Sequence, residues 1–350
     1  MRQPVSIIVP AFNAEATLPA CLAAIQSAMQ ADDELIVFDD GSTDATRQIA
    51  VGAGARILGN AGPPRGPAHG RNRGAASATR DYLLFVDADV IVRPDAIDLL
   101  AAELGQGWAV AAFGSYDDRP RSRRLPALYA NLRHHFVHQR GNHNATTFWS
   151  GIGMIDRGVF QSVGGFDEVL FAHPSIEDVE LGMRLVNGGH KIRLVPEAQG
   201  THWKDWSLWR VWHTDIVRRA LPWSRLIADG QRPQADLNLA PKERLLAIIA
   251  LAALGTIVGG LFSGPVWLAT PILISAYLIG IGPFLRVASK NVGLVQLTGM
   301  AALHFCYHVY ASATYACVRL ARGWANFLSP ARPSQATASA IKGISQITRA

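Results

Sequence analysis

The chain has 350 residues and a formal net charge of +6, although only 17% of its residues are charged and 49% are hydrophobic. The basic residues are scattered instead of gathered in a stripe, which disfavours a nucleic-acid-binding protein and favours a membrane-associated one. The three cysteines lack CxxC spacing, so neither a zinc site nor a disulfide framework is indicated. The N-terminus has no segment typical of a signal peptide, and we expect the N-terminal domain to stay in the cytoplasm.

Strand and helix patterns alternate along the N-terminal part of the chain. Apolar β-branched runs predict strands, and apolar residues spaced three and four apart predict helices. In chain order we expect a strand at 5–9, a helix at 14–29, a strand at 34–38, a helix ending near 53, a strand at 56–58, a Gly/Pro-rich loop at 59–70, a helix at 71–79 and a strand at 82–86. This order predicts an α/β, Rossmann-like fold whose mostly parallel sheet is flanked by helices. No GxGxxG sequence follows the first strand, which disfavours an ordinary dinucleotide-binding domain.

Two aspartates, Asp87 and Asp89, follow the strand predicted at 82–86. Open α/β sheets bind ligands at the edge formed by the carboxyl ends of their strands. Alternation along an extended chain directs both carboxylates to one side, where like charges repel unless a cation lies between them. Mg²⁺ and similar hard cations prefer carboxylate and phosphate oxygens. The triplet therefore indicates a divalent-cation site, with an ordinary acidic turn as the alternative.

The composition changes near residue 240. Two uncharged apolar stretches, 245–263 and 265–285, each approach the roughly 20 residues that a bilayer span needs. They predict a helical hairpin at 245–285 within a membrane region at 241–320, with a buried helical pair of a soluble domain as the alternative. Basic residues that flank the hairpin favour cytoplasmic ends on both sides. These residues are Lys242, Arg244, Arg286 and Lys290.

A third apolar stretch, at 292–318, carries His304 and His308 one helical turn apart. The spacing of the two histidines fits a metal site. We favour the interpretation that they mark the polar face of a helix, which lies at the membrane surface or packs against the catalytic domain. Two spans with an interfacial third helix keep the basic, flexible tail predicted at 321–350 in the cytoplasm, whereas three spans would export it. We therefore predict a multi-pass protein of the inner (cytoplasmic) membrane, with its catalytic domain facing the cytoplasm.

The segment that precedes the hairpin, at 203–240, combines tryptophan with arginine. Aromatic rings anchor at membrane interfaces, and basic groups meet lipid phosphates there. We expect an amphipathic interface segment and a lipid-linked acceptor; the alternative is a soluble acceptor, with the membrane part serving only as a tether. The residues concerned are Trp203, Trp206, Trp209, Trp212, Trp223, Arg210, Arg218 and Arg219.

Six separated segments, taken in order, resemble the family 2 glycosyltransferases, which are inverting enzymes of the GT-A fold. The segments are 5–13, 34–46, 68–74, 83–90 with its Asp-Ala-Asp triplet, 164–168, and 177–181 with Arg184. The resemblance covers roughly residues 4–225. It implies a GT-A domain at 1–240, a nucleotide-sugar donor that we expect to be UDP-linked, and Mg²⁺ or Mn²⁺ as the cofactor, with no nucleic acid as partner.

The resemblance also assigns donor-binding roles. Of the two adjacent aspartates, Asp40 is expected, in preference to Asp39, to accept a hydrogen bond from a uracil ring. A carboxylate that only stabilises the turn is the alternative. Arg71 is placed to meet phosphate, with a solvent-facing arginine as the alternative. The donor-binding candidates are Pro10, Ala11, Phe12, Glu15, Asp40, Arg71, Asp87, Ala88 and Asp89.

By the same resemblance the cation is held by Asp89 most directly, by Asp87, and by His202 as a third ligand. Simple stacking among tryptophans is the alternative for His202. Asp178 matches the catalytic aspartate that takes the acceptor proton; a carboxylate at a helix N-terminus is its alternative. The acceptor-side candidates are Trp149, Gly151 and Gly153, in a loop predicted at 149–154, and Glu177.

Family members that polymerise sugars carry Gln-x-x-Arg-Trp after the base, and the region at 215–223 lacks that pattern. We therefore predict a metal-dependent hexosyltransferase that moves one sugar to an acceptor hydroxyl or phosphate, in cell-envelope or polysaccharide biosynthesis. Two alternatives stay open, namely a nucleotidyltransferase that uses the Asp-x-Asp site and a non-catalytic membrane scaffold.

Overall fold

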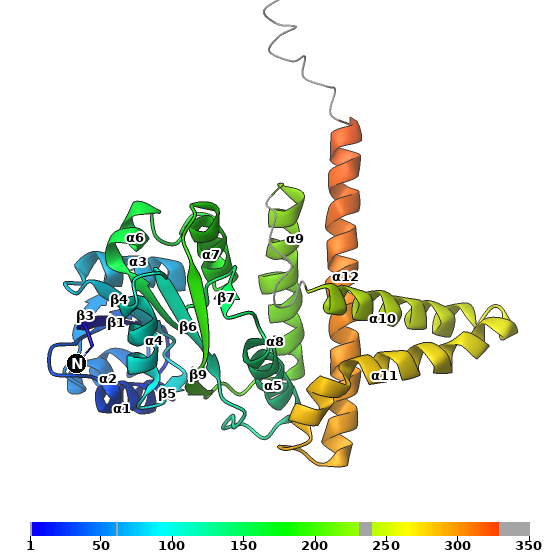
Figure 1. The fold of residues 1–350 in the computed structure, drawn as a ribbon, viewed down its shortest axis with the longest axis horizontal. Coiled ribbons are helices and arrows are strands. Elements are labelled where there is room, and N and C mark those ends of the chain that lie inside the picture. Colours follow the sequence, from blue (N-terminus) through cyan, green and yellow to red (C-terminus); the bar gives the residue numbers. More distant parts are fainter. Residues whose placement is uncertain (1, 61, 231–239, 329–350) are drawn as a thin grey trace, which may run out of the picture.

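The computed structural model describes residues 2–60, 62–230 and 240–328. An α/β unit occupies one side of the molecule and a group of helices the other (Figure 1). The elements of the α/β unit are β1 (Val5–Ala11), α1 (Leu18–Ala28), β2 (Glu34–Asp39), α2 (Thr46–Gly52), β3 (Arg56–Gly59), α3 (Pro67–Ser77), β4 (Tyr82–Val86), β5 (Val90–Val92), α4 (Ala96–Gly105), β6 (Ala111–Tyr116), α5 (Leu125–Gln139), β7 (Asn144–Ala145), β8 (Ile152–Asp156), α6 (Arg157–Ser162), α7 (Glu177–Asn187) and β9 (Ile192–His202). The helical part consists of α8 (Leu208–His213), the π-helix η1 (Thr214–Ala220), α9 (Leu221–Ala228), α10 (Pro241–Gly259), the 3-10 helix η3 (Gly264–Leu268), α11 (Ala269–Ala288) and α12 (Leu294–Leu328).

The strands form one mixed sheet in the order β3-β2-β1-β4-β8-β6-β9-β5, with β7 paired to β9. The first four strands are parallel, as expected. The prediction of a mostly parallel sheet is wrong, because beyond them the sheet is mixed: β6 and β9 are parallel, but β8 runs antiparallel to both β4 and β6, and β5 runs antiparallel to β9. Crossover helices join the early strands and require parallel neighbours, whereas β8 follows α5 and β7 and enters the sheet in the reverse direction.

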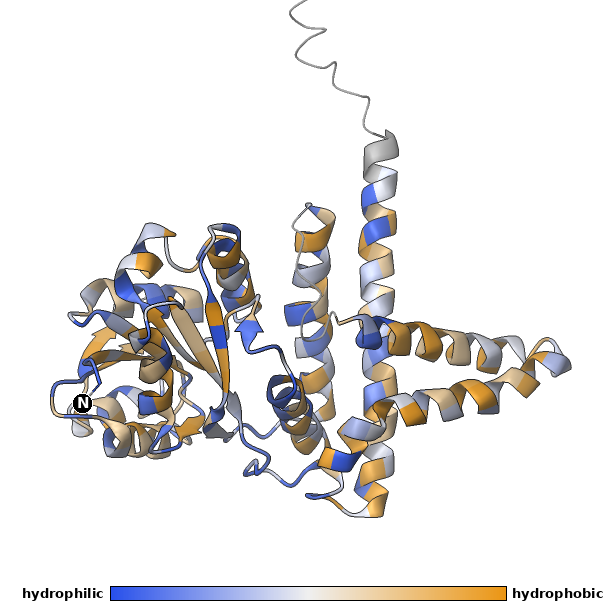
Figure 2. Cartoon of the chain, in the orientation of Figure 1, coloured by the Kyte–Doolittle hydropathy of each residue, from blue (hydrophilic) through white to orange (hydrophobic). Residues whose placement is uncertain are grey.

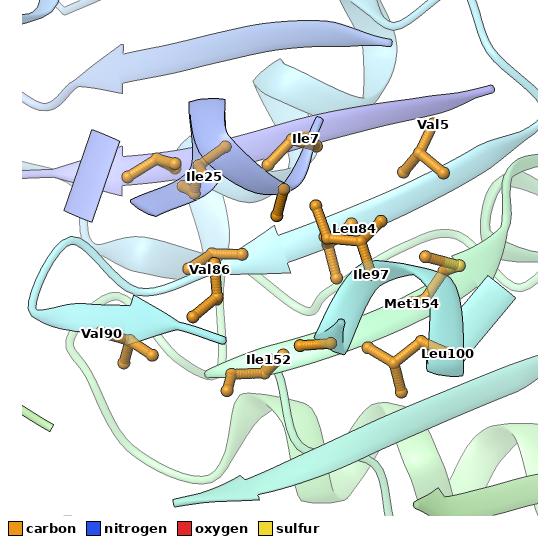
Figure 3. Close-up of a cluster of buried hydrophobic side chains, with 14 of the residues drawn as sticks. Val5, Ile7, Ile25, Leu84, Val86, Val90, Ile97, Leu100, Ile152 and Met154 are labelled. Carbon is orange, nitrogen blue, oxygen red and sulfur yellow. The ribbon is translucent and has the colours of Figure 1, made fainter. Parts of the chain in front are cut away.

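Apolar side chains cover both faces of the sheet, which explains the continuous apolar runs of its central strands. One face packs against α1 and α4, as Figure 3 shows for side chains such as Ile25 and Leu100 against Leu84 and Met154. The other face packs against α3, α6 and α7. That second cluster includes Ile8, Phe85, Phe113, Ala75, Phe160 and Leu181.

The strands predicted at 5–9, 34–38, 56–58 and 82–86 are confirmed as β1 to β4. Three boundaries are wrong. The helix predicted at 14–29 begins at Leu18, because residues 15–17 form a turn and Pro19 suits the first turn of a helix. The helix predicted to begin at Arg71 begins at Pro67, because proline suits the first helical turn and Gly66, at φ 91°, supplies the sharp entry. The loop predicted at 149–154 ends at Gly151, because Ile152 already belongs to β8.

In the helical part, α10 and α11 with η3 form a hairpin that projects away from the α/β unit, while α12 runs crosswise at its base (Figure 1). The predicted helical pair is therefore present. Among the described residues, the helical stretch Gly264–Ala288 alone is long and apolar enough to cross a membrane. Large apolar side chains are exposed along the hairpin, which is mostly orange in Figure 2. They include Leu261, Phe262, Leu268, Ile272 and Ile279.

The third predicted segment, at 292–318, corresponds to α12, which continues past 320 to Leu328. The remainder of the predicted tail, and positions 231–239 of the predicted interface segment, lie outside the described residues. Helix α5 joins the two parts of the molecule, because its Leu128 and Tyr129 pack with Phe284 of α11 and Met300 of α12. The hairpin is thus anchored to the α/β unit through a buried apolar junction.

Candidate functional site

One cavity of about 2210 Å³ extends from the carboxyl edge of the sheet to the base of the hairpin. Its first end is lined by Pro10, Ala11, Phe12, Asp40, Arg71, Asp87, Ala88 and Asp89. Its middle is lined by Tyr116, His134, Trp149, Ser150, Glu177, Asp178, His202 and Trp203. Its far end is lined by Arg218, Arg219, Trp223, Glu243, Ala247, Leu251, Tyr307, Ala311 and Tyr315. Most of the predicted donor, base and acceptor residues therefore face one continuous space.

The Asp-Ala-Asp turn lies between β4 and β5, and the sheet brings a third candidate ligand to it. Val90 of β5 pairs antiparallel with His202 of β9. As a result, His202 Nε2 lies 3.8 Å from Asp89 Oδ2. The predicted trio of Asp87, Asp89 and His202 thus meets at one edge, although His202 is far from the aspartates in the sequence.

A basic side chain that sequence reasoning missed, Lys204, completes this edge, with its Nζ 3.3 Å from Asp89 Oδ2. Burial opposes ionisation of Asp89, but Lys204 and His202 beside it hold the pKa of its carboxyl below the usual value. Burial lowers the pKa of His202 to about 4, so its imidazole is neutral at pH 7. A carboxylate next to a neutral imidazole is a donor set that fits a divalent cation such as Mn²⁺.

Arg71 does not face solvent; it is buried at the start of α3 between two carboxylates. Its Nη2 donates to Asp87 Oδ1 at 2.7 Å and its Nη1 to Glu177 Oε1 at 2.9 Å. Glu177 in turn accepts from the backbone N–H of Ser175 at 2.8 Å. Arg71 therefore links the Asp-Ala-Asp turn to the first residue of α7. Burial raises the pKa of Asp87, and the charge of Arg71 opposes that rise.

Asp178 lies in the first turn of α7, where the helix dipole favours a carboxylate. Its Oδ2 accepts from the backbone N–H of Ser150 at 3.1 Å and lies 3.2 Å from the Ser150 hydroxyl. Burial, with the charge of Glu177 next to it, raises the pKa of Asp178 to about 6. A partly buried carboxyl with a pKa near neutrality, facing a cavity, has the properties required of a general base.

The first end of the cavity, where the donor-binding candidates lie, is shaped by Asp40, which follows β2. Its carboxylate accepts from the backbone N–H groups of Arg65 and Gly66, at 2.9 and 2.7 Å, and from the Asn60 side chain. Asp40 therefore holds the Gly/Pro-rich loop closed over this end. Glu15 does not line the cavity; its Oε2 accepts from the backbone N–H of Ala45 beside α2, at 3.1 Å.

Aromatic rings wall the middle of the cavity. Tyr116 stacks on His202 with ring centroids 4.4 Å apart, and Trp149 packs edge-on against Tyr116. Trp149 thus occupies the predicted acceptor side. Gly151 and Gly153 do not line the cavity: Gly153 lies inside β8, where a Cβ would collide with Trp149 and Phe148. Their small size serves packing of the sheet instead of acceptor approach.

At the far end, η1 directs basic side chains toward the cavity. π-helical turns are rare and often mark functional sites. Here Arg218 and Arg219 line the cavity, and Asp215 of the same turn is buried against Arg133 of α5, with Nη2 and Oδ1 2.7 Å apart. Tyr310 of α12 donates its hydroxyl to Asp215 at 2.6 Å. Burial opposes ionisation of Asp215, but Arg133 lowers the pKa of its carboxyl to about 2.

Sequence reasoning missed Lys204 and Tyr116 as residues of the site, and it included Ser150 only as part of the loop predicted at 149–154. Lys204 lies within the interface segment predicted at 203–240, but only the β5–β9 pairing brings it to Asp89. Tyr116 ends β6, a strand that no sequence pattern had identified.

Comparison with known proteins identifies the N-terminal domain. Residues 6–164 match the family described as glycosyl transferase family 2. A solved mannosyltransferase from Pyrobaculum calidifontis, in complex with GDP-Man and Mn²⁺, is similar with a TM-score of 0.55 and 19% sequence identity, over 90% of this chain and 88% of that one. Residues 6–164 are therefore similar to a glycosyltransferase family 2 domain, and the α/β fold with its mixed sheet is GT-A-like.

Curated relatives are similar over shorter stretches. A PGL/p-HBAD biosynthesis glycosyltransferase of Mycobacterium bovis is 38% identical over 106 residues, which are 29% of this chain and 41% of the relative. A glucosyl-3-phosphoglycerate synthase of Mycobacterium tuberculosis is 32% identical over 126 residues, which are 33% of this chain and 38% of the relative. The matched stretches thus span about two fifths of the length of these curated relatives.

Proposed function

We propose that this chain, through its glycosyltransferase family 2 domain, is a membrane-associated inverting hexosyltransferase. It would move one sugar from a nucleotide-sugar donor, which we expect to be UDP-linked, to the hydroxyl or phosphate of a lipid-linked acceptor in cell-envelope or polysaccharide biosynthesis. The observation that carries the proposal is the single cavity in which Asp87, Asp89, Asp178 and the apolar surface of α10 and α12 all take part.

The donor would enter at the end of the cavity formed by Pro10, Phe12 and Asp40. The Gly/Pro-rich loop that is hydrogen-bonded to Asp40 would lie beside the bound donor. Phe12, 47% exposed, offers a ring face at this end. The diphosphate would then lie toward Asp89 and Lys204. The Lys204 ammonium and a cation at this edge would both balance its negative charge.

A divalent cation held by Asp89, His202 and Asp87 would supply Lewis-acid stabilisation of the leaving nucleoside diphosphate, worth several kcal/mol. Arg71 fixes the orientation of Asp87 through a charge-assisted hydrogen bond. Tyr116 stacks on His202 and fixes the ring plane. The chain therefore preorganises the edge before donor arrives.

Asp178 would take the proton of an acceptor hydroxyl during in-line attack on the anomeric carbon. Ser150 orients the carboxylate through its backbone N–H, and burial keeps the pKa of Asp178 high enough for proton transfer near neutral pH. With a phosphate acceptor, which arrives already ionised, the same residue would have no proton to remove. Dependence on Asp178 thus distinguishes the two acceptor classes.

The apolar far end supports a lipid-linked acceptor. Ala247 and Leu251 of α10 and Ala311 and Tyr315 of α12 line it, and Arg218 and Arg219 stand between these side chains and the catalytic edge. An apolar wall followed by two arginines matches a lipid chain that ends in a phosphate. The same arginines fit an acceptor whose sugar is joined through a diphosphate.

Membrane attachment is part of the proposal. The exposed apolar hairpin would enter the inner membrane, and the basic residues at its base, Lys242 and Arg286 among them, would stay on the cytoplasmic side. Because α12 runs crosswise to the hairpin at its base (Figure 1), it would lie along the membrane surface. The catalytic domain would then face the cytoplasm.

The test is a donor screen with the full chain in membranes, with Mn²⁺ or Mg²⁺, followed by mass analysis of extracted lipids. One donor should release nucleoside diphosphate and add one hexose mass to a lipid. Release of pyrophosphate would instead identify a nucleotidyltransferase. Equal kcat/KM for a water-soluble acceptor and a lipid acceptor would remove the lipid part of the proposal.

A further inference from the structure

A second group of metal-ligating side chains lies outside the catalytic edge, at the base of the hairpin. Glu243 of α10 and His304 and His308 of α12 each offer one ligand atom, and all three atoms lie within 4.8 Å of one another. His304 and His308 are buried, with 5% and 3% of their surface exposed. Nothing in the proposed sugar transfer uses this cluster, which the sequence had suggested only as a histidine pair.

We propose that Glu243, His304 and His308 bind a divalent transition-metal ion, with Zn²⁺ as the best match. Two imidazoles and one carboxylate form a known zinc ligand set, with Zn–N and Zn–O distances of about 2.0–2.2 Å. Tetrahedral ligand atoms at such distances lie about 3.4 Å apart. The observed 3.2 Å between His308 Nε2 and Glu243 Oε2 fits this separation. The ligand atoms of the whole cluster lie within 4.8 Å of one another, so the cluster would contract when the ion binds.

The groups around the two histidines support ligation through both Nε2 atoms. Tyr277 Oη lies 2.9 Å from His308 Nδ1, and Tyr129 Oη lies 3.2 Å from His304 Nδ1. When each Nδ1–H donates to its tyrosine, the Nε2 lone pair is free for a metal. Metal-bound histidines commonly have such a second hydrogen bond, which fixes the tautomer and the ring orientation.

The position of the cluster indicates what the ion would do. Its ligands and their tyrosine partners come from α10, α12, α11 and α5, so one ion would tie both arms of the hairpin to α12 and to the α/β unit. The proposed site is therefore a structural clamp at the junction, with water as the fourth ligand, and it does not depend on the proposed transferase activity.

The test measures Zn²⁺ alone on the full chain in detergent. Asp89→Asn serves as the parent, so that the catalytic edge does not contribute metal. After dialysis against Zn²⁺ and gel filtration, the parent should retain one equivalent of zinc and unfold at a higher temperature than the chelator-treated protein. Adding Glu243→Gln or His308→Asn should abolish both effects, whereas adding Glu197→Gln, an exposed carboxylate of β9, should leave them unchanged.

A milder variant covers the case in which a ligand substitution disturbs folding. Tyr277→Phe removes only the group behind His308 and should weaken zinc binding by about 10- to 100-fold without changing the far-ultraviolet circular dichroism. The proposal is overturned if the parent retains no zinc above the buffer level, or if Glu243→Gln and Tyr277→Phe both bind it as tightly as the parent. Either result would mean that the cluster is a plain Glu–His–Tyr hydrogen-bond network.

Discussion

The two ends of the cavity are built in opposite ways. At the proposed catalytic end, buried or partly buried carboxylates such as Asp40, Asp87 and Asp178 each have partners on the chain, and the sheet edge fixes their positions. At the hairpin end, the walls are apolar side chains of α10 and α12, and large apolar residues remain exposed beyond them. Charge is preorganised at one end, while at the other an apolar surface is left for something else to cover.

The largest effect on activity is expected when the proposed base, at the catalytic end of the cavity, is removed. Asp178→Asn should lower kcat about 10²- to 10⁴-fold with a hydroxyl acceptor, because a positioned base contributes about that much. Initial rates of nucleoside diphosphate release measure this fall in kcat. Burial disfavours the charged form, so the amide should leave thermal stability equal or slightly higher.

Glu197→Gln is the matched control for this change, since it neutralises an exposed carboxylate of β9. Its rate should equal that of the unmodified chain. An Asp178→Asn protein that keeps most of its activity on a hydroxyl acceptor would move the base elsewhere, or point to a phosphate acceptor.

The next largest effect is expected at the cation edge. Asp89→Asn should lower kcat/KM about 100-fold or more, because several kcal/mol of charge stabilisation would be lost and each 1.4 kcal/mol is a factor of ten. The Mn²⁺ concentration that gives half of the maximal rate should also rise. If the rate and the Mn²⁺ dependence are unchanged, the cation does not bind at Asp89.

The pH profile tests whether the catalytic end is tuned by burial. Asp178 must be ionised to accept a proton, and burial raises its pKa to about 6. Activity should therefore be full above about pH 7 and fall about tenfold per unit as the pH drops below 6. The profile of kcat/KM for a hydroxyl acceptor measures this, and an acid limb near pH 4 would show that burial does not tune the base.

The sequence could predict the site residues that follow the early parallel strands, but not those that long-range pairing brings to them. The first four strands and the residues at their carboxyl ends follow from apolar runs and from the crossover rule, so Asp40, Asp87 and Asp89 could be placed at one edge in advance. His202 and Asp178 came only through the family resemblance, since antiparallel β5–β9 pairing and the α7 position have no local signal.

Other features depend on long-range packing that no short pattern encodes. Lys204 reaches Asp89 only through the sheet register, and Arg71 turned out to be buried between Asp87 and Glu177. Gly153, predicted to lie in the loop at 149–154, lies in a strand where neighbouring side chains leave no space for a Cβ. Errors of this kind arise where tertiary contacts override local preference.

The smallest effect should come from the hairpin end, and it should depend on the acceptor. Leu251→Arg places a charge on the apolar wall and should lower kcat/KM for a lipid acceptor about tenfold, the order expected when a lipid chain loses about 1.4 kcal/mol of apolar contact. Its rate with a water-soluble acceptor should not change, because the catalytic edge is untouched. Leu245→Arg is the matched control, since Leu245 lies on the same helix, is 57% exposed and is not among the described residues that line the cavity. Equal loss with both acceptors would mean that the far end supports the fold of the whole site instead of binding lipid.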